Sequence, residues 1–585
     1  MRINQQFYWT VLGGVSIIFH IWLIFSGLIP NLVSRPLHMA LALPWCLMYG
    51  RHGSSLKFGT LLTAAGIFCC AYIVFNQELL SEQYGYISSM WQTGVAILLL
   101  TIVLEMARRS IGWPLPCVAL IALCYGLFGQ YIPGEFGHPG LPLNSFLGTM
   151  TIAEGGIWGK LTGVSVNVVA IFVIFGAVLN AGEAGQGFMN LATAAAGHLK
   201  AGVAKVSVLS SALFGSISGS ASANVASTGS FTLPAMIRQG YPRDFAAAVE
   251  AVASSGGQIM PPLMGAGAFV MVELTGIPYT EIMSASVLPA LLFFFTVWIG
   301  INAFSSRMEL KAVDEVDRPS AKTVWITAMF FFVPFLILLE RMFLGRYTPQ
   351  FAACVAILAA SLLLILNAKM EISLKRALQR LQAVCLNSGR QIAMIASIII
   401  CAGIIIGVLG QTGLGVKISS TVISASGGML WPALLLTAFA CLLLGMEVPT
   451  TAAYLICVSV AGPALQSLGL PLLITHLFVF WYALLSTITP PVCGTVFIAA
   501  GMVEEKNWLK VAGKSMALGV GLYLVPLGMV ANPALIELST NPLAAIMVFL
   551  KIALSLALIS YGIIAARTFI FRLGLIIGGA VILFI

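Results

Sequence analysis

Two distant stretches of the chain carry the same pattern of helix-breaking residues. Six positions of the first stretch recur in the second without a gap, as Pro234, Ala235, Gly240, Pro242, Pro261 and Pro262 become Pro463, Ala464, Gly469, Pro471, Pro490 and Pro491. The offset is 229 residues throughout (Pro490 against Pro261). Pro and Gly interrupt helices, so the duplication predicts two copies of one unit, each containing a broken helix. Secondary transporters bind substrates and coupling ions at such breaks, where backbone groups are free. The pattern therefore predicts a transporter.

The composition places this unit in a membrane. Of the 585 residues, 59% are hydrophobic and 8% are charged, whereas soluble domains contain roughly a quarter charged residues. Apolar runs of about twenty residues recur along the chain, which predicts an all-α polytopic membrane protein. The formal net charge of +9 fits an excess of Lys and Arg in cytoplasmic loops, so nucleic acid is not an expected partner. The 11 Cys residues lack metal-binding spacing and are interpreted as small hydrophobic residues.

Hydropathy predicts a series of membrane crossings and two helical hairpins. The hairpins are expected at about 203–236 and 430–465, one in each copy of the repeat. Each is expected to be re-entrant, so that it enters and leaves the membrane on the same side. The crossings are expected near 7–29, 37–50, 58–76, 89–107, 113–131, 164–182, 243–274, 284–304, 324–343, 349–366, 391–412, 472–503, 511–531, 542–565 and 573–585.

The distribution of Lys and Arg predicts the orientation of these elements. With a cytoplasmic N-terminus, most of the 29 Lys and Arg residues fall on the cytoplasmic side, in agreement with the positive-inside rule. An odd number of crossings then separates the hairpins, so the first enters from the cytoplasm and the second from outside. The two copies are thus predicted to form an inverted-topology repeat, the architecture that supports alternating access.

The same pattern divides the chain into five regions. Residues 1–110 precede the repeat and are predicted to form a four-helix module. The other regions are a first half with the first hairpin, a polar cytoplasmic linker, a second half with the second hairpin, and C-terminal membrane helices, at 111–304, 305–322, 323–540 and 541–585.

The hairpin turns are rich in polar side chains that carry oxygen. The candidate binding residues there are Ser218, Ser220, Ser222, Asn224, Glu447, Thr450 and Thr451. Neutral oxygens and freed carbonyls suit Na⁺, and the N-terminus of a downstream half-helix suits an anion. Small residues also allow close helix packing in membranes, which is the alternative interpretation of such a cluster. Its recurrence in the second copy favours a binding site.

The two Pro-Pro pairs are expected to break their helices within the membrane. Pro has no N–H and clashes with the preceding turn, so carbonyl groups upstream lose their helical partners. Together with nearby side-chain oxygens, these carbonyls can coordinate a cation. The candidate residues at the breaks are Ser254, Ser255, Gly256, Gln258, Ser486, Thr487 and Thr489. A simple kink is the alternative, but two equivalent breaks that each face a hairpin favour a site.

Few ionisable residues lie at membrane depth. Glu250 lies about two helical turns inside its span, and His476 lies near the start of another. Charged groups are costly in a bilayer and usually functional, so both are candidates for coupling, with structural hydrogen bonding as the alternative. Neither Lys160 nor Lys514 belongs to a complete nucleotide-binding P-loop. Neither ATP-driven transport nor enzymatic activity is therefore expected.

Several of these motifs resemble the fused permeases of tripartite ATP-independent periplasmic (TRAP) transporters, the 4TM/12TM class. The resemblance covers nearly the whole chain and rests on residues 35–38, 107–113, 214–224, 228–232, 248–262, 449–454, 476–480 and 532–535. It implies an importer in the cell inner membrane that moves a small organic acid by Na⁺ symport and works with an extracytoplasmic substrate-binding protein. It also implies an elevator-type transport domain, with residues 1–110 as its scaffold.

The resemblance assigns residues to the ion and substrate region by position. That region would include Ser218, Ser220, Asn224, Gly256, Thr450 and Thr451, and the Na⁺ ligands are expected among Ser220, Asn224, Gly256, Thr450, Thr451 and Thr487. Two residues depart from the family pattern. Glu447 stands where Gly is expected, and Thr487 stands where Asp is expected. A carboxylate is thus absent from the broken helix and present at the facing hairpin.

Three alternatives follow from these features. One is proton coupling through Glu447 and Glu250. Another is a dicarboxylate or citrate symporter that needs no binding protein, against which the four-helix module argues. The third is a membrane assembly or signalling protein that retains an inherited scaffold.

Labelling of the hairpin turns tests the inverted repeat. In a Cys-free background, a membrane-impermeant thiol reagent should reach a single Cys in the first turn only from the cytoplasmic side. It should reach a Cys in the second turn only from outside, because the two copies are inserted with opposite orientation. Labelling of both turns from one compartment would contradict the inverted repeat.

Overall fold

The computed structural model is all-helical, as the sequence predicts. It describes residues 3–308, 318–491, 493–566 and 568–585, and within these ranges the side chains of 3–5, 307–308 and 447 are not described. Helices make up 80% of the chain. In the described part, the one pairing of the β type is an isolated bridge between Leu366 and Ile372. The middle of the predicted linker 305–322 and the side chain of Glu447 lie outside the described residues.

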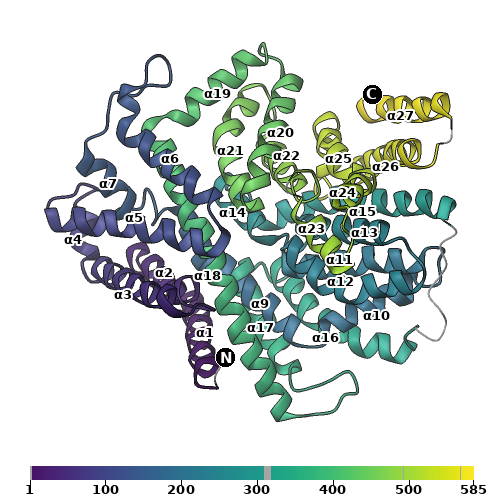
Figure 1. Ribbon diagram of the computed structural model, residues 1–585, viewed down its shortest axis with the longest axis horizontal. Helices are drawn as coiled ribbons and strands as arrows, with labels where there is room; N and C mark the ends of the chain where they lie inside the picture. Colours follow the sequence, from purple (N-terminus) through teal and green to yellow (C-terminus); the bar gives the residue numbers. More distant parts are fainter. Residues whose placement is uncertain (1–2, 309–317, 492, 567) are drawn as a thin grey trace.

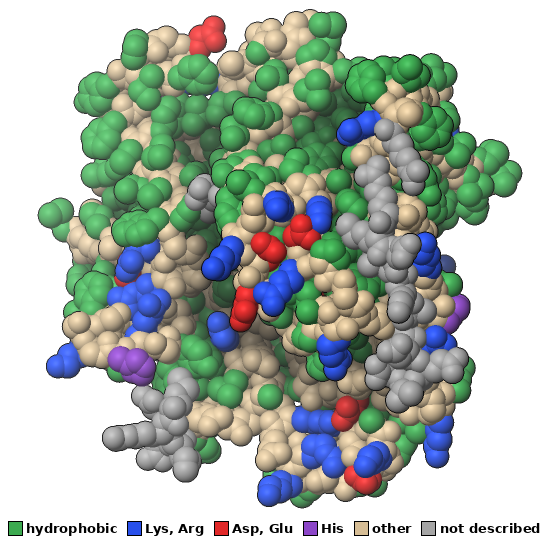
Figure 2. All heavy atoms as spheres, turned by 45° about the vertical axis from the view of Figure 1, so that its right-hand side comes forward, with side chains coloured by type: hydrophobic (Ala, Val, Ile, Leu, Met, Phe, Trp, Pro, Cys, Tyr) green, Lys and Arg blue, Asp and Glu red, His purple; other side chains and the backbone are tan. Residues whose placement is uncertain are grey.

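The surface of the helices is suited to lipid. Ten of the described helical segments are long and apolar enough to cross a membrane. Large apolar side chains are exposed on them, such as Ile18, Leu61 and Leu336. Faces of this kind mark contact with a membrane rather than with water. In Figure 2 the upper part of the molecule is mostly hydrophobic, and Lys and Arg gather over its middle and lower parts.

The N-terminal helices form a group of their own at the left of Figure 1. They are α1 (Ile3–Phe25), α2 (Asn31–Leu47), α3 (Gly53–Phe75), the short α4 (Gln77–Glu82) and α5 (Met90–Ile111). This group packs against α18 (Leu374–Thr412), which runs through the middle of the molecule. Two glycines allow α1 and α2 to lie close to α18. Gly13 on α1 lies against the backbone of Cys385, and the Trp45 ring on α2 covers Gly389.

Several helices that pack on α18 lead into the repeat. They are α6 (Pro114–Phe128), α7 (Leu143–Thr151), α8 (Lys160–Val164), a π-helical turn (Ser165–Val169) and α9 (Ala170–Ala181). Between the two copies of the repeat lie α16 (Ala321–Phe343) and α17 (Pro349–Leu363), which pack on each other, and α17 also packs on α9. The chain ends with α26 (Pro542–Ile564) and α27 (Phe569–Phe584), which pack on each other.

The two copies of the repeat fold in the same register. The first contains α10 (Ala184–Ala196), α11 (Gly202–Ser218), α12 (Ala221–Arg238), α13 (Arg243–Gly256), α14 (Gly265–Thr275) and α15 (Tyr279–Met308). The second contains α19 (Leu414–Ala425), α20 (Leu430–Glu447), α21 (Thr450–Ser467), α22 (Leu472–Leu485), α23 (Gly494–Met502), α24 (Trp508–Leu518) and α25 (Val520–Ala531). The offset of 229 relates the first residues of α12 and α21 (221 and 450) and those of α13 and α22 (243 and 472). The sequence duplication is therefore a structural duplication.

Each predicted hairpin is a pair of helices joined by two residues. In the first, Gly219 ends α11 with a positive φ of 58°, a left-handed conformation that Gly adopts without steric cost. In the second, Val448 and Pro449 separate α20 from α21. Pro449 cannot continue a helix and disfavours helical geometry at the residue before it. The side from which each hairpin enters a membrane stays a prediction.

Both predicted breaks are present. The segment between α13 and α14 holds one 3-10 turn (Gly257–Ile259) and the pair Pro261-Pro262. The equivalent segment between α22 and α23 holds Pro490-Pro491, and both Pro-Pro peptide bonds are cis. With 14 residues each, α13 and α22 are only about 21 Å long. Each therefore ends well short of the roughly 30 Å of a hydrocarbon core.

Several helices differ from the expectation, among them the short α4 and α7, which were not predicted. α10 and α19, which lead into the two hairpins, were not predicted, because at 13 and 12 residues they are too short to be recognised as crossings. The crossing expected at 391–412 is the second part of α18, which has 39 residues. Its first part carries Lys375, Arg376 and Arg380, and hydropathy does not assign such a segment to a crossing helix.

Close backbone packing at the first break can be tested with one methyl group. Gly215 on α11 touches the backbone of Gly257, so a Cβ at position 215 would overlap it. Gly215→Ala should lower the stability of the purified protein by about 1–3 kcal/mol, because an overpacked core must shift. Gly410→Ala is the control, since no other group lies within 4 Å of a Cβ there. Equal melting temperatures in detergent for both variants would contradict this packing.

Candidate functional site

Each hairpin tip lies against the broken helix of its own half. In the first half, Gly219 at the tip touches Gly265 at the start of α14. Ser216 accepts a backbone hydrogen bond of 3.3 Å from Leu263. In the second half, a Cβ on Gly445 would lie 2.8 Å from the Ser486 hydroxyl oxygen. The residues of the tips and breaks, far apart in sequence, thus meet in both halves.

The two breaks also meet each other. The Thr487 hydroxyl donates to the Ser255 oxygen at 2.9 Å, and Ser255 lies 3.2 Å from the Thr495 hydroxyl. Thr495 in turn donates to the Thr487 carbonyl at 2.7 Å. This chain of hydroxyls connects the first half to the second at the centre of the repeat. Ser255 and Thr487 were predicted from the sequence, whereas Thr495 was missed. The repeat could not reveal it, because the equivalent residue in the first half is Ala266.

Asn224 ties the first hairpin to the first break. Its side chain is fully buried. The amide nitrogen donates to the carbonyl oxygens of Ser211 on α11, at 2.8 Å, and Ser254 on α13, at 3.3 Å. The amide oxygen lies 3.3 Å from the Thr228 hydroxyl, whose single proton is also in reach of Glu250, so the amide oxygen keeps capacity for a further partner.

Some predicted residues have polar atoms without a protein partner. The Ser218 hydroxyl oxygen is buried and has no hydrogen bond to any residue that the structure describes. The half-buried side chains of Gln258, Thr450 and Thr451 likewise have none within the described part of the chain. Thr450 and Thr451 begin α21, whose first turn has no side-chain cap. Free N–H groups and hydroxyls at a helix N-terminus can bind an anion, and unpaired oxygens can bind a cation.

Other predicted residues have their polar groups occupied locally. Ser220 caps α12 by accepting from the Ala223 N–H at 3.3 Å. Ser486 and Thr489 donate to carbonyls one turn back in their own helix, and Thr489 also contacts the Tyr523 hydroxyl at 2.7 Å. Ser222 is exposed, on the face of α12 turned away from the break.

Gly256 has a packing role in this structure. A side chain at this position would run into the Phe293 ring on α15. Of the predicted residues here, the side chain of Glu447 lies outside the described residues. Its equivalent in the first half, by the offset of 229, is Ser218, the residue whose hydroxyl is unpaired.

Glu250 is enclosed by hydroxyl groups. It is fully buried on α13, and the groups that donate to its carboxylate belong to Ser207, Ser211, Thr228, Thr232 and Ser254. They come from α11, α12 and α13, so the carboxylate holds the first hairpin to the broken helix. The sequence signal for this cluster is the spacing of four residues within each pair on α11 and α12 (207 and 211, 228 and 232), which places both hydroxyls on one helix face.

Among the described residues, His476 has one polar partner, which lies in the second half. Its Nδ1 lies 2.7 Å from the Tyr454 hydroxyl, and both side chains are buried. Tyr454 is on α21 and His476 on α22. The pair therefore joins the second hairpin to the second broken helix, as the Glu250 cluster does in the first half, although with a neutral tyrosine hydroxyl in place of a carboxylate.

Comparison with known proteins assigns the family. The family described as "Tripartite ATP-independent periplasmic transporter, DctM component" matches residues 98–544, more than half of the chain. The chain belongs to the DctM family. The resemblance to TRAP permeases is thereby confirmed, and the DctM-family chain is a transporter permease rather than an enzyme. The match begins within α5, so α1–α4 lie outside it.

Three curated relatives of this DctM-family permease align with between 32% and 62% of its length. It is 27% identical over 338 residues to the C4-dicarboxylate TRAP transporter large permease protein DctM of Pseudomonas aeruginosa, which aligns 57% of this chain and 76% of that protein. The protein of the same name from Rhodobacter capsulatus is 24% identical over 387 residues, 62% of this chain and 86% of its own. The isethionate TRAP transporter permease protein DctMQ of Oleidesulfovibrio alaskensis is 30% identical over 193 residues, 32% and 29% of the two chains.

Replacing Glu250 tests the hydroxyl cluster. Glu250→Ala should destabilise the permease by about 2–4 kcal/mol, because several buried hydroxyls lose their acceptor. Glu250→Gln should cost less, since the amide still accepts hydrogen bonds. Thermal melting in detergent measures both, with the exposed Glu82→Ala as the control. A Glu250→Ala variant that melts with the parent protein would contradict this role.

Proposed function

We propose that this DctM-family permease imports a small organic acid by Na⁺ symport. The observation that supports the proposal best is the meeting of two helix breaks and two hairpin tips around groups without partners. The buried Ser218 hydroxyl has no hydrogen bond, and the first turn of α21 carries Thr450 and Thr451 without a cap. Helix ends of this kind supply ligands for an ion and for a carboxylate.

The donor set fits Na⁺ as the coupling ion. We assign its ligands to Ser220, Asn224, Gly256, Thr450, Thr451 and Thr487. Asn224 would contribute its amide oxygen, because its amide nitrogen is committed to two carbonyls. Gly256 would contribute only its backbone carbonyl. The Thr487 hydroxyl donates to Ser255, so its oxygen keeps lone pairs for an ion.

The substrate class follows from chemistry and from the relatives. An uncapped helix N-terminus favours an anionic group, and the relatives reported above are named for C4-dicarboxylates and isethionate. We assign to this permease a small carboxylate, delivered by an extracytoplasmic substrate-binding protein as in tripartite systems. In this proposal the chain lies in the cell inner membrane, with a cytoplasmic N-terminus and re-entrant hairpins.

The arrangement supports an elevator-type movement. The tips, the breaks and the Glu250 cluster form one polar unit held by many hydrogen bonds. The N-terminal helices pack instead on α18. In the proposal, α18 and the N-terminal group act as the scaffold, and the repeat carries ion and substrate past it. Residues 1–110 would then contribute stability and position rather than ligands.

Substitution of the two threonines on α21 tests the ion site. Na⁺ should raise the melting temperature of the purified permease, compared with K⁺ at the same ionic strength, because an ion that binds only the folded state stabilises it. Thr450→Val combined with Thr451→Val should remove this effect and lower Na⁺-dependent uptake at least about tenfold, a loss near 1.4 kcal/mol.

Thr101→Val is the matched control for this experiment. Thr101 is exposed on α5, and its hydroxyl donates only to the Ile97 carbonyl at 2.8 Å. That variant should keep the full Na⁺ effect. If the double variant retains Na⁺ stabilisation, or if uptake is driven by a pH gradient without Na⁺, Na⁺ symport at this site is refuted.

A further inference from the structure

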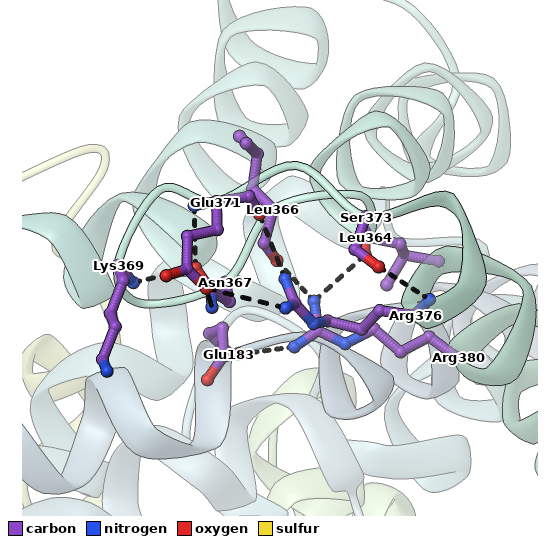
Figure 3. Close-up of polar contacts among 9 residues, drawn as sticks. All are labelled: Glu183, Leu364, Leu366, Asn367, Lys369, Glu371, Ser373, Arg376 and Arg380. Atoms are coloured by element: carbon purple, nitrogen blue, oxygen red, sulfur yellow. Dashed lines mark hydrogen bonds and ion pairs between the residues drawn. The ribbon is translucent and has the colours of Figure 1, made fainter.

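A largely buried ion pair lies where α9 passes into α10. Arg380 on α18 contacts the Glu183 carboxylate, and their side chains are 14% and 20% exposed. The same guanidinium donates to the carbonyl oxygens of Leu364, at 3.0 Å, and Leu366. Figure 3 shows the side chain reaching between these groups. Arg380 therefore joins three segments: the start of α10, the end of α17 and the first part of α18.

The junction itself is narrow. Two residues, Gly182 and Glu183, connect α9 to α10, and the backbone of Gly182 is extended (φ −86°, ψ −154°). Glu183 occupies the N-cap position of α10 but makes no capping hydrogen bond. Capping at this position is typical of the shorter side chains of Ser, Thr, Asp and Asn. In this structure the Glu183 carboxylate is turned instead toward Arg380, so it connects α10 to another helix.

α10 connects this junction to the first hairpin. It packs on α11, the first helix of that hairpin, and on α16. The contact with α16 includes the Phe188 and Phe331 rings, 4.7 Å apart, and a hydrogen bond of 3.0 Å from Asn190 to Thr327. The end of α10 nearer α9 is thus fixed by charge, and the rest is held by apolar and neutral contacts. A short helix held in this way can turn about its charged end.

The equivalent junction of the second half is built differently. There, Gly413 with a φ of 67° separates α18 from α19. The Lys417 ammonium on α19 contacts the backbone carbonyl of Gly137. A neutral carbonyl replaces the carboxylate. The Ser419 hydroxyl on α19 also donates to the Val460 carbonyl of the second hairpin at 2.6 Å. The first connecting helix is therefore held by an ion pair, whereas these contacts of the second end on neutral carbonyls.

We propose that Glu183 is a positioning residue for transport. Its ion pair with Arg380 fixes the pivot about which α10 carries the first hairpin, and Arg380 is held in turn by the end of α17. This inference rests on the proposed function, since it assumes that the hairpin moves relative to α18. It concerns the pivot, which can be measured without substrate or binding protein.

The test measures the position of α10 relative to α18. Spin labels at Ala195 and Leu378, both exposed, report that distance by pulsed electron resonance in full-length permease, with the exposed Cys117 and Cys124 replaced by Ala. Glu183→Ala removes the pair but leaves Arg380 on its two carbonyls. The distance distribution should become roughly twofold broader, because the charged end of α10 is released.

Matched variants separate a pivot from general loosening. Arg376, in the first turn of α18, forms a more exposed ion pair of 3.9 Å with Glu371, which lies just before that helix. Glu371→Ala removes this pair and should leave the distance distribution unchanged. Glu183→Gln retains an acceptor for the guanidinium and should give an intermediate width. If Glu183→Ala fails to fold, Glu183→Gln provides the same readout. A distribution as narrow as that of the parent in both Glu183 variants, or equal broadening in Glu371→Ala, would overturn the proposal.

The outcome is independent of the test of function. If Na⁺ has no effect but the distance distribution broadens when Glu183 is replaced, the permease has the pivot without the proposed coupling. If uptake depends on Na⁺ but the distance distribution does not broaden, the permease has the proposed function without this pivot.

Discussion

The fold depends on burying two interrupted helices. In lipid, a backbone N–H or C=O without a partner costs several kcal/mol, so a helix broken within the membrane must find its partners in the protein. Here each break is covered by the tip of a hairpin, and the breaks cover each other through Ser255 and Thr487. The approach is close enough that Gly215 and Gly257 admit no side chain. The same closeness gathers the polar groups of the candidate site.

The two halves share a backbone but differ in chemistry. In the first, five hydroxyls surround the Glu250 carboxylate and fasten the hairpin to α13. In the second, Tyr454 and His476 make the equivalent link. A buried carboxylate is tolerated when its oxygens are fully hydrogen-bonded. This asymmetry confines the carboxylate cluster to the first half. Hydroxyls without a partner among the described residues occur in both halves, at Ser218 in the first and at Thr450 and Thr451 in the second.

Polar contacts also attach the N-terminal helices to the rest of the chain. The ring nitrogens of His20 and His38 lie 2.7 Å apart, and His38 reaches the Ser165 hydroxyl at 3.0 Å, in the π-helical turn before α9. Arg35 donates to the Trp158 carbonyl. The structure thus gives the motif at 35–38 a physical role: two of its side chains form buried links between α2 and the helices that lead into the repeat. Such links suit a scaffold that keeps one position.

The helical class, the duplication and the positions of the helix breaks can be predicted from the residues alone, because hydropathy, Pro and Gly act locally. The offset of 229 between Pro261 and Pro490 also relates equivalent helix ends of the two copies, such as Gly256 of α13 and Leu485 of α22. Which polar groups have a hydrogen-bond partner and which have none depends on how the chain folds. Nothing in the sequence distinguishes Ser218, whose hydroxyl is unpaired, from Ser254, which donates to Glu250. The distinction arises from contacts between segments distant in sequence, as does the pairing of Glu183 with Arg380 across 197 positions.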